Sequence, residues 1–109
     1  MRVTYDKLIR DRIPEIIMAN GDRAVTRVLD AEEYRTALLA KLVEEAQEAR
    51  NAAADELPDE LADVLEVLLA LLSTLPLTWQ QVEDLAAAKR AERGGFQGRI
   101  FLEYTEQTT

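Results

Sequence analysis

The stretch Lys41–Asp63, KLVEEAQEARNAAADELPDELAD, places carboxylates where an amphipathic helix normally buries apolar side chains. An α-helix turns by about 100° per residue. With Leu38 set at zero, Glu45 falls at about −20°, near the centre of the core-facing stripe, and Glu48 at about −80°, on its edge. A solvated glutamate is not expected at the first of these positions. The apolar members of the stripe are Tyr34, Leu38, Leu42, Ala49 and Ala52.

The next helix repeats this conflict. It is expected to begin at Pro58 and to carry an apolar arc of about 200°. Glu60 falls inside that arc beside Val64 and Val67, and Asp63 falls just beyond its border. Burial of an ionised carboxylate without a partner is costly, so such groups are usually paired or bound to a metal. Four carboxylates on two neighbouring helices therefore predict a bound cation.

Length and composition favour a single all-α domain over residues 1–109. The chain is 48% hydrophobic and 31% charged, which is typical of a globular, soluble protein, and it is rich in helix-forming Ala, Leu and Glu. Its longest apolar run, Val67–Leu72, is too short to cross a bilayer. Charged residues interrupt the beginning of the chain, where a signal peptide would be apolar. We therefore expect a cytoplasmic protein with no membrane partner.

The charged and reactive residue types narrow the chemistry further. A net charge of −8 disfavours non-specific binding to nucleic acid, which depends on a cationic surface. The absence of cysteine and histidine excludes disulfides, thiolate zinc sites and histidine-based acid–base catalysis. An acidic protein can still bind a phosphorylated small molecule when divalent metals reverse the local charge. The available chemistry belongs to carboxylates, lysine and arginine.

The first thirty residues are expected to contain one short helix. Asp11 can cap it, Pro14 suits its first turn, and Asn20-Gly21 ends it. A short strand is possible at Arg2–Tyr5, whereas Asp22–Leu29 has no clear period and is expected to be irregular. The side chains of this helix that are expected to face inward are Ile13, Ile16 and Ile17.

Two long helices follow. Asp30 and Glu33 resemble a capping box, which begins a helix that runs to about Ala54. Pro58 opens the next helix, which runs to about Thr74. Since short connections favour antiparallel neighbours, these two helices should form a hairpin.

The last third begins with a second capping box, formed by Thr78 and Gln81. The helix that it opens runs to about Arg93 and is ended by Gly94-Gly95. Alternating apolar residues in Phe96–Tyr104 fit either a short strand or a packed arm. Residues 105–109 are expected to be frayed.

The wide apolar arc of the Pro58 helix also predicts self-association. A helix packed on one neighbour needs an apolar stripe only a little over 100° wide. A symmetric partner hairpin would complete a four-helix bundle, so we expect a homodimer or a dimer of dimers. The residues expected near the subunit contact are Leu65, Leu68, Leu69 and Leu72.

The spacing of the carboxylates indicates which cation they suit. Glu45 and Glu48 are three residues apart, as are Glu60 and Asp63, so each pair shares one helix surface. Oxygen donors without nitrogen or sulfur suit Mg²⁺ or Mn²⁺. Such pairs are also frequent on acidic helices that only contact solvent. Their occurrence in tandem on apolar faces favours the metal site.

Three segments in order resemble a known family. The pattern Glu44-Glu45-x-x-Glu48 followed by Glu60-x-x-Asp63 resembles the signature of the all-α nucleoside triphosphate pyrophosphohydrolases, which include MazG, dimeric dUTPases and phosphoribosyl-ATP pyrophosphohydrolase. The opening YDKLIRDRIPEII and the later KRAERGGF resemble the MazG-like branch, described as house-cleaning enzymes for noncanonical nucleotides. The resemblance covers most of the chain.

The resemblance implies Mg²⁺-dependent hydrolysis of a nucleoside triphosphate between its α and β phosphates, which releases the monophosphate and pyrophosphate. Glu45, Glu48, Glu60 and Asp63 match the metal ligands of the family. Glu44 is a candidate base for the attacking water, with an ordinary solvated glutamate as the equal alternative.

Basic side chains are candidates for binding the triphosphate. Lys41 lies one turn before Glu45 on the same face, where it can reach a phosphate or pair with Glu45 or Glu48. We favour the ion pair. Solvated surface is the alternative for the others. The candidate substrate-binding residues are Lys7, Arg10, Lys41, Lys89 and Arg93.

A second function fits the same residues. In a noncatalytic helical interaction module, the wide apolar arc binds a partner protein, and the carboxylates pair with Lys41 and with arginines. Dependence on a divalent metal separates this module from the enzyme.

Overall fold

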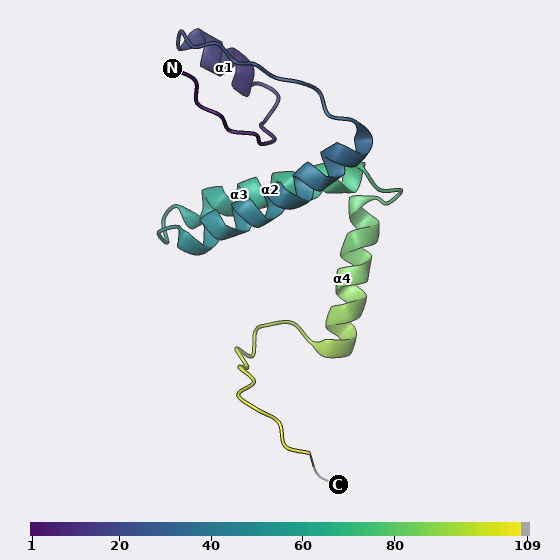
Figure 1. The fold of residues 1–109 in the computed structure, drawn as a ribbon. Helices are drawn as coiled ribbons and strands as arrows, with labels where there is room; N and C mark the ends of the chain where they lie inside the picture. The colour runs from purple at the N-terminus through teal and green to yellow at the C-terminus, as the bar shows by residue number, and fades with distance from the viewer. Residues whose placement is uncertain (108–109) are drawn as a thin grey trace. The chain divides into compact units, whose positions relative to one another are not determined.

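The computed structural model describes residues 1–107 and contains four α-helices, with no strand over those residues (Figure 1). The all-α fold class is therefore confirmed. The helices are α1 (Ile13–Ala19), α2 (Ala31–Asn51), α3 (Leu57–Ser73) and α4 (Trp79–Arg93).

The chain divides into two compact units. The first, Met1–Pro76, holds α1, α2 and α3, and the second begins at Leu77 and holds α4 and the segment that follows it. A single domain across residues 1–109 stays a prediction. Among the described residues, no helix combines the length and apolar character that a bilayer crossing requires.

Helices α2 and α3 form the predicted antiparallel hairpin and lie side by side (Figure 1). The capping box is present: Asp30 Oδ1 accepts from the Glu33 backbone N–H at 2.8 Å, and Glu33 Oε1 accepts from the Asp30 N–H at 3.3 Å. α2 ends at Asn51 and not near Ala54, because Ala52 adopts an extended backbone with ψ of 148°.

Helix α3 begins one residue before Pro58, which occupies the first turn as expected. The last carbonyls of a helix lack the N–H partner that the next turn would supply. Arg35 of α2 supplies one, since its Nη2 donates to the backbone oxygen of Thr74 at 2.7 Å. This bond ties the beginning of α2 to the end of α3.

The core of the hairpin is narrow. Leu38 of α2 and Val67 of α3 are the buried apolar side chains within residues 1–107, at 3% and 7% exposure. The other predicted members of the α2 stripe are half-buried, which confirms the orientation of that helix. On α3, Leu68 and Leu72 are half-buried, whereas Leu65 and Leu69 are exposed.

The first unit departs from expectation around α1. Asp11 does not cap this helix, because Arg12 occupies the N-cap position in a helical conformation and the Ile13 N–H already bonds to the Arg10 carbonyl. Ile13 and Ile17 are half-buried, but Ile16 is exposed, so the prediction that Ile16 faces inward is wrong. The segment Arg2–Tyr5 is not a strand, since no neighbouring strand pairs with it in the described part of the chain. Asn20-Gly21 ends the helix as predicted, with the glycine at φ of 91°.

The second unit confirms the other capping box. The Gln81 N–H donates to Thr78 Oγ1 at 3.1 Å, and the Thr78 N–H donates to Gln81 Oε1 at 2.8 Å. Gly94 ends α4 with φ of 85°. The segment Phe96–Tyr104 is neither a strand nor a packed arm, because its apolar side chains are exposed. Of the tail expected to be frayed, residues 108–109 lie outside the described residues.

Candidate metal centre

Glu45 is the buried charged residue of the hairpin, with 7% of its surface exposed. This agrees with its predicted place near the centre of the apolar stripe. Its Oε2 is buried and, within the described residues 1–107, accepts no hydrogen bond. A buried carboxylate oxygen without a donor is unfavourable in a folded protein unless something else binds it.

Four other carboxylates surround Glu45 in two overlapping groups. One oxygen each from Glu45, Glu60 and Asp63 lie within 4.8 Å of one another, and the same holds for Glu44, Glu45 and Glu48. Glu45 belongs to both groups. The structure therefore brings three of the four predicted ligands into one group, with Glu48 joined to them through Glu45.

The geometry and chemistry of this cluster fit a small divalent cation. Ligand oxygens of octahedral Mg²⁺ lie about 2.9 to 4.2 Å apart, given a metal–oxygen distance of about 2.1 Å. A mutual separation within 4.8 Å is close to this range. Glu60 is half-buried, and its Oε2, like that of Glu45, is buried without a hydrogen-bond partner among the described residues. Two such oxygens in one all-oxygen cluster suit Mg²⁺ or Mn²⁺.

The environment of Glu45 raises its pKa above the ordinary value. Burial is the largest cause, followed by the negative charge of Glu48, and the Lys41 ammonium opposes both effects in part. An ionised Glu45 is thus disfavoured where it stands, and added positive charge would relieve it.

Lys41 forms the predicted ion pair with Glu45, with 3.4 Å between Nζ and Oε1, and its side chain is only 17% exposed. Its second partner is Glu44, at 3.6 Å, and not Glu48 as the sequence also allowed. Because both partners are on α2, one turn apart, the helical spacing alone was enough to predict the contact.

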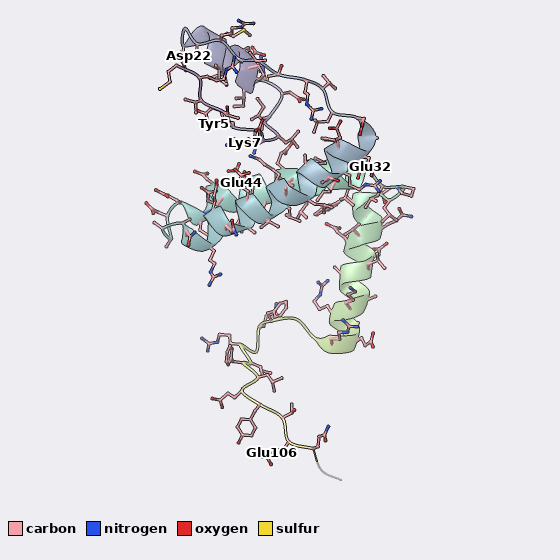
Figure 2. The ribbon with its side chains drawn as sticks, in the orientation of Figure 1. Tyr5, Lys7, Asp22, Glu32, Glu44 and Glu106 are labelled. Atoms are coloured by element: carbon pink, nitrogen blue, oxygen red, sulfur yellow. The ribbon has the colours of Figure 1, made fainter. Side chains whose placement is uncertain are left out.

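Two further cations reach the cluster from the segment that precedes α1. Lys7 lies on the side of this segment that faces the hairpin, above Glu44 (Figure 2), with 3.8 Å between Nζ and Oε1. Arg10 Nη2 lies 2.7 Å from Asp63 Oδ1. The sequence proposed both residues for the site but not these partners, because Arg10 and Asp63 are 53 residues apart.

The sequence analysis did not identify one contact near the cluster, and two of its candidates belong to the second unit. The Tyr5 ring lies 5.8 Å from Lys7 Nζ, a cation–π distance that the i, i+2 spacing in an irregular segment did not indicate. Lys89 and Arg93 are exposed on α4 in the second unit, so their role at the site stays a prediction.

The charges of the cluster do not balance. Five carboxylates face three cationic side chains, which leaves a formal charge of −2. One divalent cation would neutralise this excess. The cations also show that the cluster already attracts positive charge from separate parts of the chain.

Comparison with known proteins gives a partial match. A segment of 46 residues is 54% identical to part of a Mycolicibacterium smegmatis protein described as uncharacterized. The match covers 42% of this chain and 47% of that protein, so it spans about half of the relative's length. No family model matches the chain. No solved structure matches it.

Proposed function

We propose that this chain is a Mg²⁺-dependent nucleoside triphosphate pyrophosphohydrolase of the MazG-like type, with a role in removing unwanted nucleotides. The observation that carries the proposal is the buried carboxylate of Glu45. One of its oxygens has no hydrogen-bond partner in the described part of the chain, and it lies within 4.8 Å of carboxylates from both helices. Such a group indicates a bound cation. The carboxylate pattern and the two flanking motifs supply the resemblance from which the reaction is inferred.

In this proposal Glu45, Glu48, Glu60 and Asp63 hold Mg²⁺, with Mn²⁺ as a substitute. When bound, the ion neutralises the triphosphate, orients it and lowers the pKa of water. The burial of Glu45 and the packing of α2 on α3 hold Glu45 and half-buried Glu60 in place, whereas Glu48 is exposed at the edge of the site.

Glu44 is the proposed general base. Its carboxylate lies within 4.8 Å of those of Glu45 and Glu48, and its side chain is 36% exposed, so it can meet a water molecule at the edge of the cluster. Glu44 accepts a proton from that water, whose oxygen bonds to the α phosphorus. The bond from the α phosphorus to the bridging oxygen breaks, and pyrophosphate leaves with the electron pair.

The cationic side chains complete the proposed site. Lys7, Arg10 and Lys41 already lie at the cluster and can bind phosphate oxygens, which arginine does in a bidentate manner. Lys89 and Arg93 are assigned to the same role from the resemblance alone. The active form is proposed to be a homodimer or a dimer of dimers.

The position of bond cleavage tests the reaction. In water labelled with ¹⁸O, attack at the α phosphorus puts the label in the nucleoside monophosphate and releases unlabelled pyrophosphate. A panel of ordinary and damaged nucleoside triphosphates would identify the base and sugar preference. Orthophosphate as the first product would contradict the proposal.

One observation favours a second candidate, the interaction module. Leu61, Leu65 and Leu69 follow one another at a spacing of four on α3 and are exposed, which suits a helical partner. The melting temperature with and without millimolar Mg²⁺ separates the two functions, because a ligand that binds the native state raises it. An unchanged melting temperature would favour the module.

A further inference from the structure

The segment before α1 is attached to the hairpin at carboxylates that are proposed to serve the metal reaction. Arg10 pairs with Asp63 of α3, and Lys7 pairs with Glu44 of α2. Asp63 is a proposed metal ligand, whereas Glu44 is the proposed base. A divalent cation and Arg10 therefore compete for the Asp63 carboxylate.

The backbone of the segment holds Lys7 in this position. Asp6 has φ of 45°, in the left-handed region that aspartate tolerates better than most residues, and the chain bends at Lys7. The Tyr5 ring then lies 5.8 Å from the Lys7 ammonium. The contact with Glu44 thus follows from a defined local conformation.

The Arg10 pair is well formed but exchangeable. Its 2.7 Å distance is that of a charge-assisted hydrogen bond, while the two side chains are 57% and 40% exposed. An ion pair with this exposure contributes little net stability, so a divalent ion can displace the guanidinium at small cost. The displaced guanidinium is then free to bind a phosphate.

We propose that Arg10 changes partner during ligand binding: it pairs with Asp63 in the metal-free protein and binds a phosphate of the triphosphate once Mg²⁺ occupies Asp63. Residues 1–12 thereby act as a strap that leaves the carboxylates and closes on the metal-bound substrate. The identity of the phosphate ligand rests on the proposed function. The competition at Asp63 rests only on the metal-binding part of that function and not on the reaction.

Calorimetry tests this proposal, because Arg10→Gln should raise the affinity for Mg²⁺ and lower the affinity for a triphosphate analogue. Arg10→Gln should bind Mg²⁺ alone roughly two- to fivefold more tightly, which is the effect of losing one exposed ion-pair competitor. With Mg²⁺ present, the same variant should bind bis(methylene)triphosphonate, a non-hydrolysable triphosphate, about tenfold or more weakly. Unchanged or weaker Mg²⁺ binding, or an unchanged triphosphonate affinity, would overturn the change of partner.

Arg12→Gln is the matched control. Arg12 belongs to the same segment, is exposed and pairs at 3.6 Å with Glu15, which is not one of the cluster carboxylates. It should leave both affinities unchanged. Equal effects of the two substitutions would mean that only the overall charge of the segment matters, which would also overturn the proposal.

Trypsin cleavage after Arg10 gives a second measurement on the wild-type protein. Cleavage should be faster with Mg²⁺ alone than in EDTA, and slower again with Mg²⁺ and the triphosphonate. Equal rates in the three conditions would contradict the strap. If the protein shows the expected affinities but releases no pyrophosphate, the proposed function fails while the change of partner stands. If it releases pyrophosphate while Arg10→Gln keeps wild-type affinities, only the change of partner fails.

Discussion

The Lys41 ammonium lies 3.4 Å from Oε1 of Glu45, whereas Oε2 of the same carboxylate is buried and has no donor among residues 1–107. The Lys41 ammonium thus pairs with one of the two oxygens of this buried carboxylate. The other oxygen requires a further partner between α2 and α3.

Removal of Lys41 should therefore destabilise the metal-free protein. Lys41→Met keeps the aliphatic stem but leaves Glu45 without its cation, and the expected loss is about 1–3 kcal/mol in the free energy of unfolding. Millimolar Mg²⁺ should reduce the loss, because it replaces the missing positive charge. Urea unfolding in EDTA and in Mg²⁺ measures both values. Lys89→Met, an exposed lysine on α4, serves as the control, and an equal loss in that variant would refute the role of the Glu45 pair.

Neutral versions of the ligands should separate activity from folding. Glu48→Gln and Asp63→Asn keep the side-chain shape and remove one ligand charge, so pyrophosphate release should fall by orders of magnitude. Because the carboxylates repel one another without metal, Glu48→Gln is also expected to raise the melting temperature in EDTA. Near-wild-type turnover in both variants would show that the metal site is wrongly assigned.

The pH dependence of stability should reveal the ion pair between Arg27 and Glu33, in the first turn of α2. The hydrogen bond from Arg27, followed by that from the Asp30 backbone, lowers the pKa of Glu33 below its ordinary 4.5. A lowered folded-state pKa stabilises the protein above pH 4.5, and this contribution is lost as the pH falls through the folded value. Glu33→Gln should thus lower the melting temperature at neutral pH and approach the wild type in acid. Glu32→Gln, in the same turn, should show a smaller difference, and a constant offset for Glu33→Gln would contradict the linkage.

Assembly can be tested at Leu69, which is 42% exposed on α3. In a monomer, Leu69→Glu would be nearly neutral, because the new charge would remain in water. In a bundle of two hairpins it would bury an unpaired charge and dissociate or unfold the protein. Light scattering at micromolar concentration distinguishes these results, with Val28→Glu, at a 97% exposed position, as the control. A wild-type monomer of 12.3 kDa with full activity would contradict the proposed assembly.

The helices and the buried carboxylate followed from local rules that the sequence displays. Capping boxes at Asp30 and Thr78 gave two helix starts, and the helical period placed Glu45 in the core. Helical spacing likewise gave the Lys41 pair. These predictions succeeded because each depends on residues within one turn or one helix.

The contacts of the irregular segments could not be predicted in the same way. The pairing of Arg10 with Asp63 depends on how the chain folds back over 53 residues, which no periodicity encodes. The prediction of a strand at Arg2–Tyr5 is wrong because a strand requires a second strand to pair with, which the local sequence does not reveal. The cap assigned to Asp11 failed because the chain had already turned at Arg12.

The most direct test of the central claim is the release of pyrophosphate from a panel of nucleoside triphosphates by the wild-type protein and by Glu45→Gln, with Mg²⁺ and with EDTA. The account predicts equal amounts of monophosphate and pyrophosphate from the wild type in Mg²⁺, and loss of both products in EDTA or in the folded variant. Undiminished release by Glu45→Gln, or release by the wild type that persists in EDTA, would contradict it.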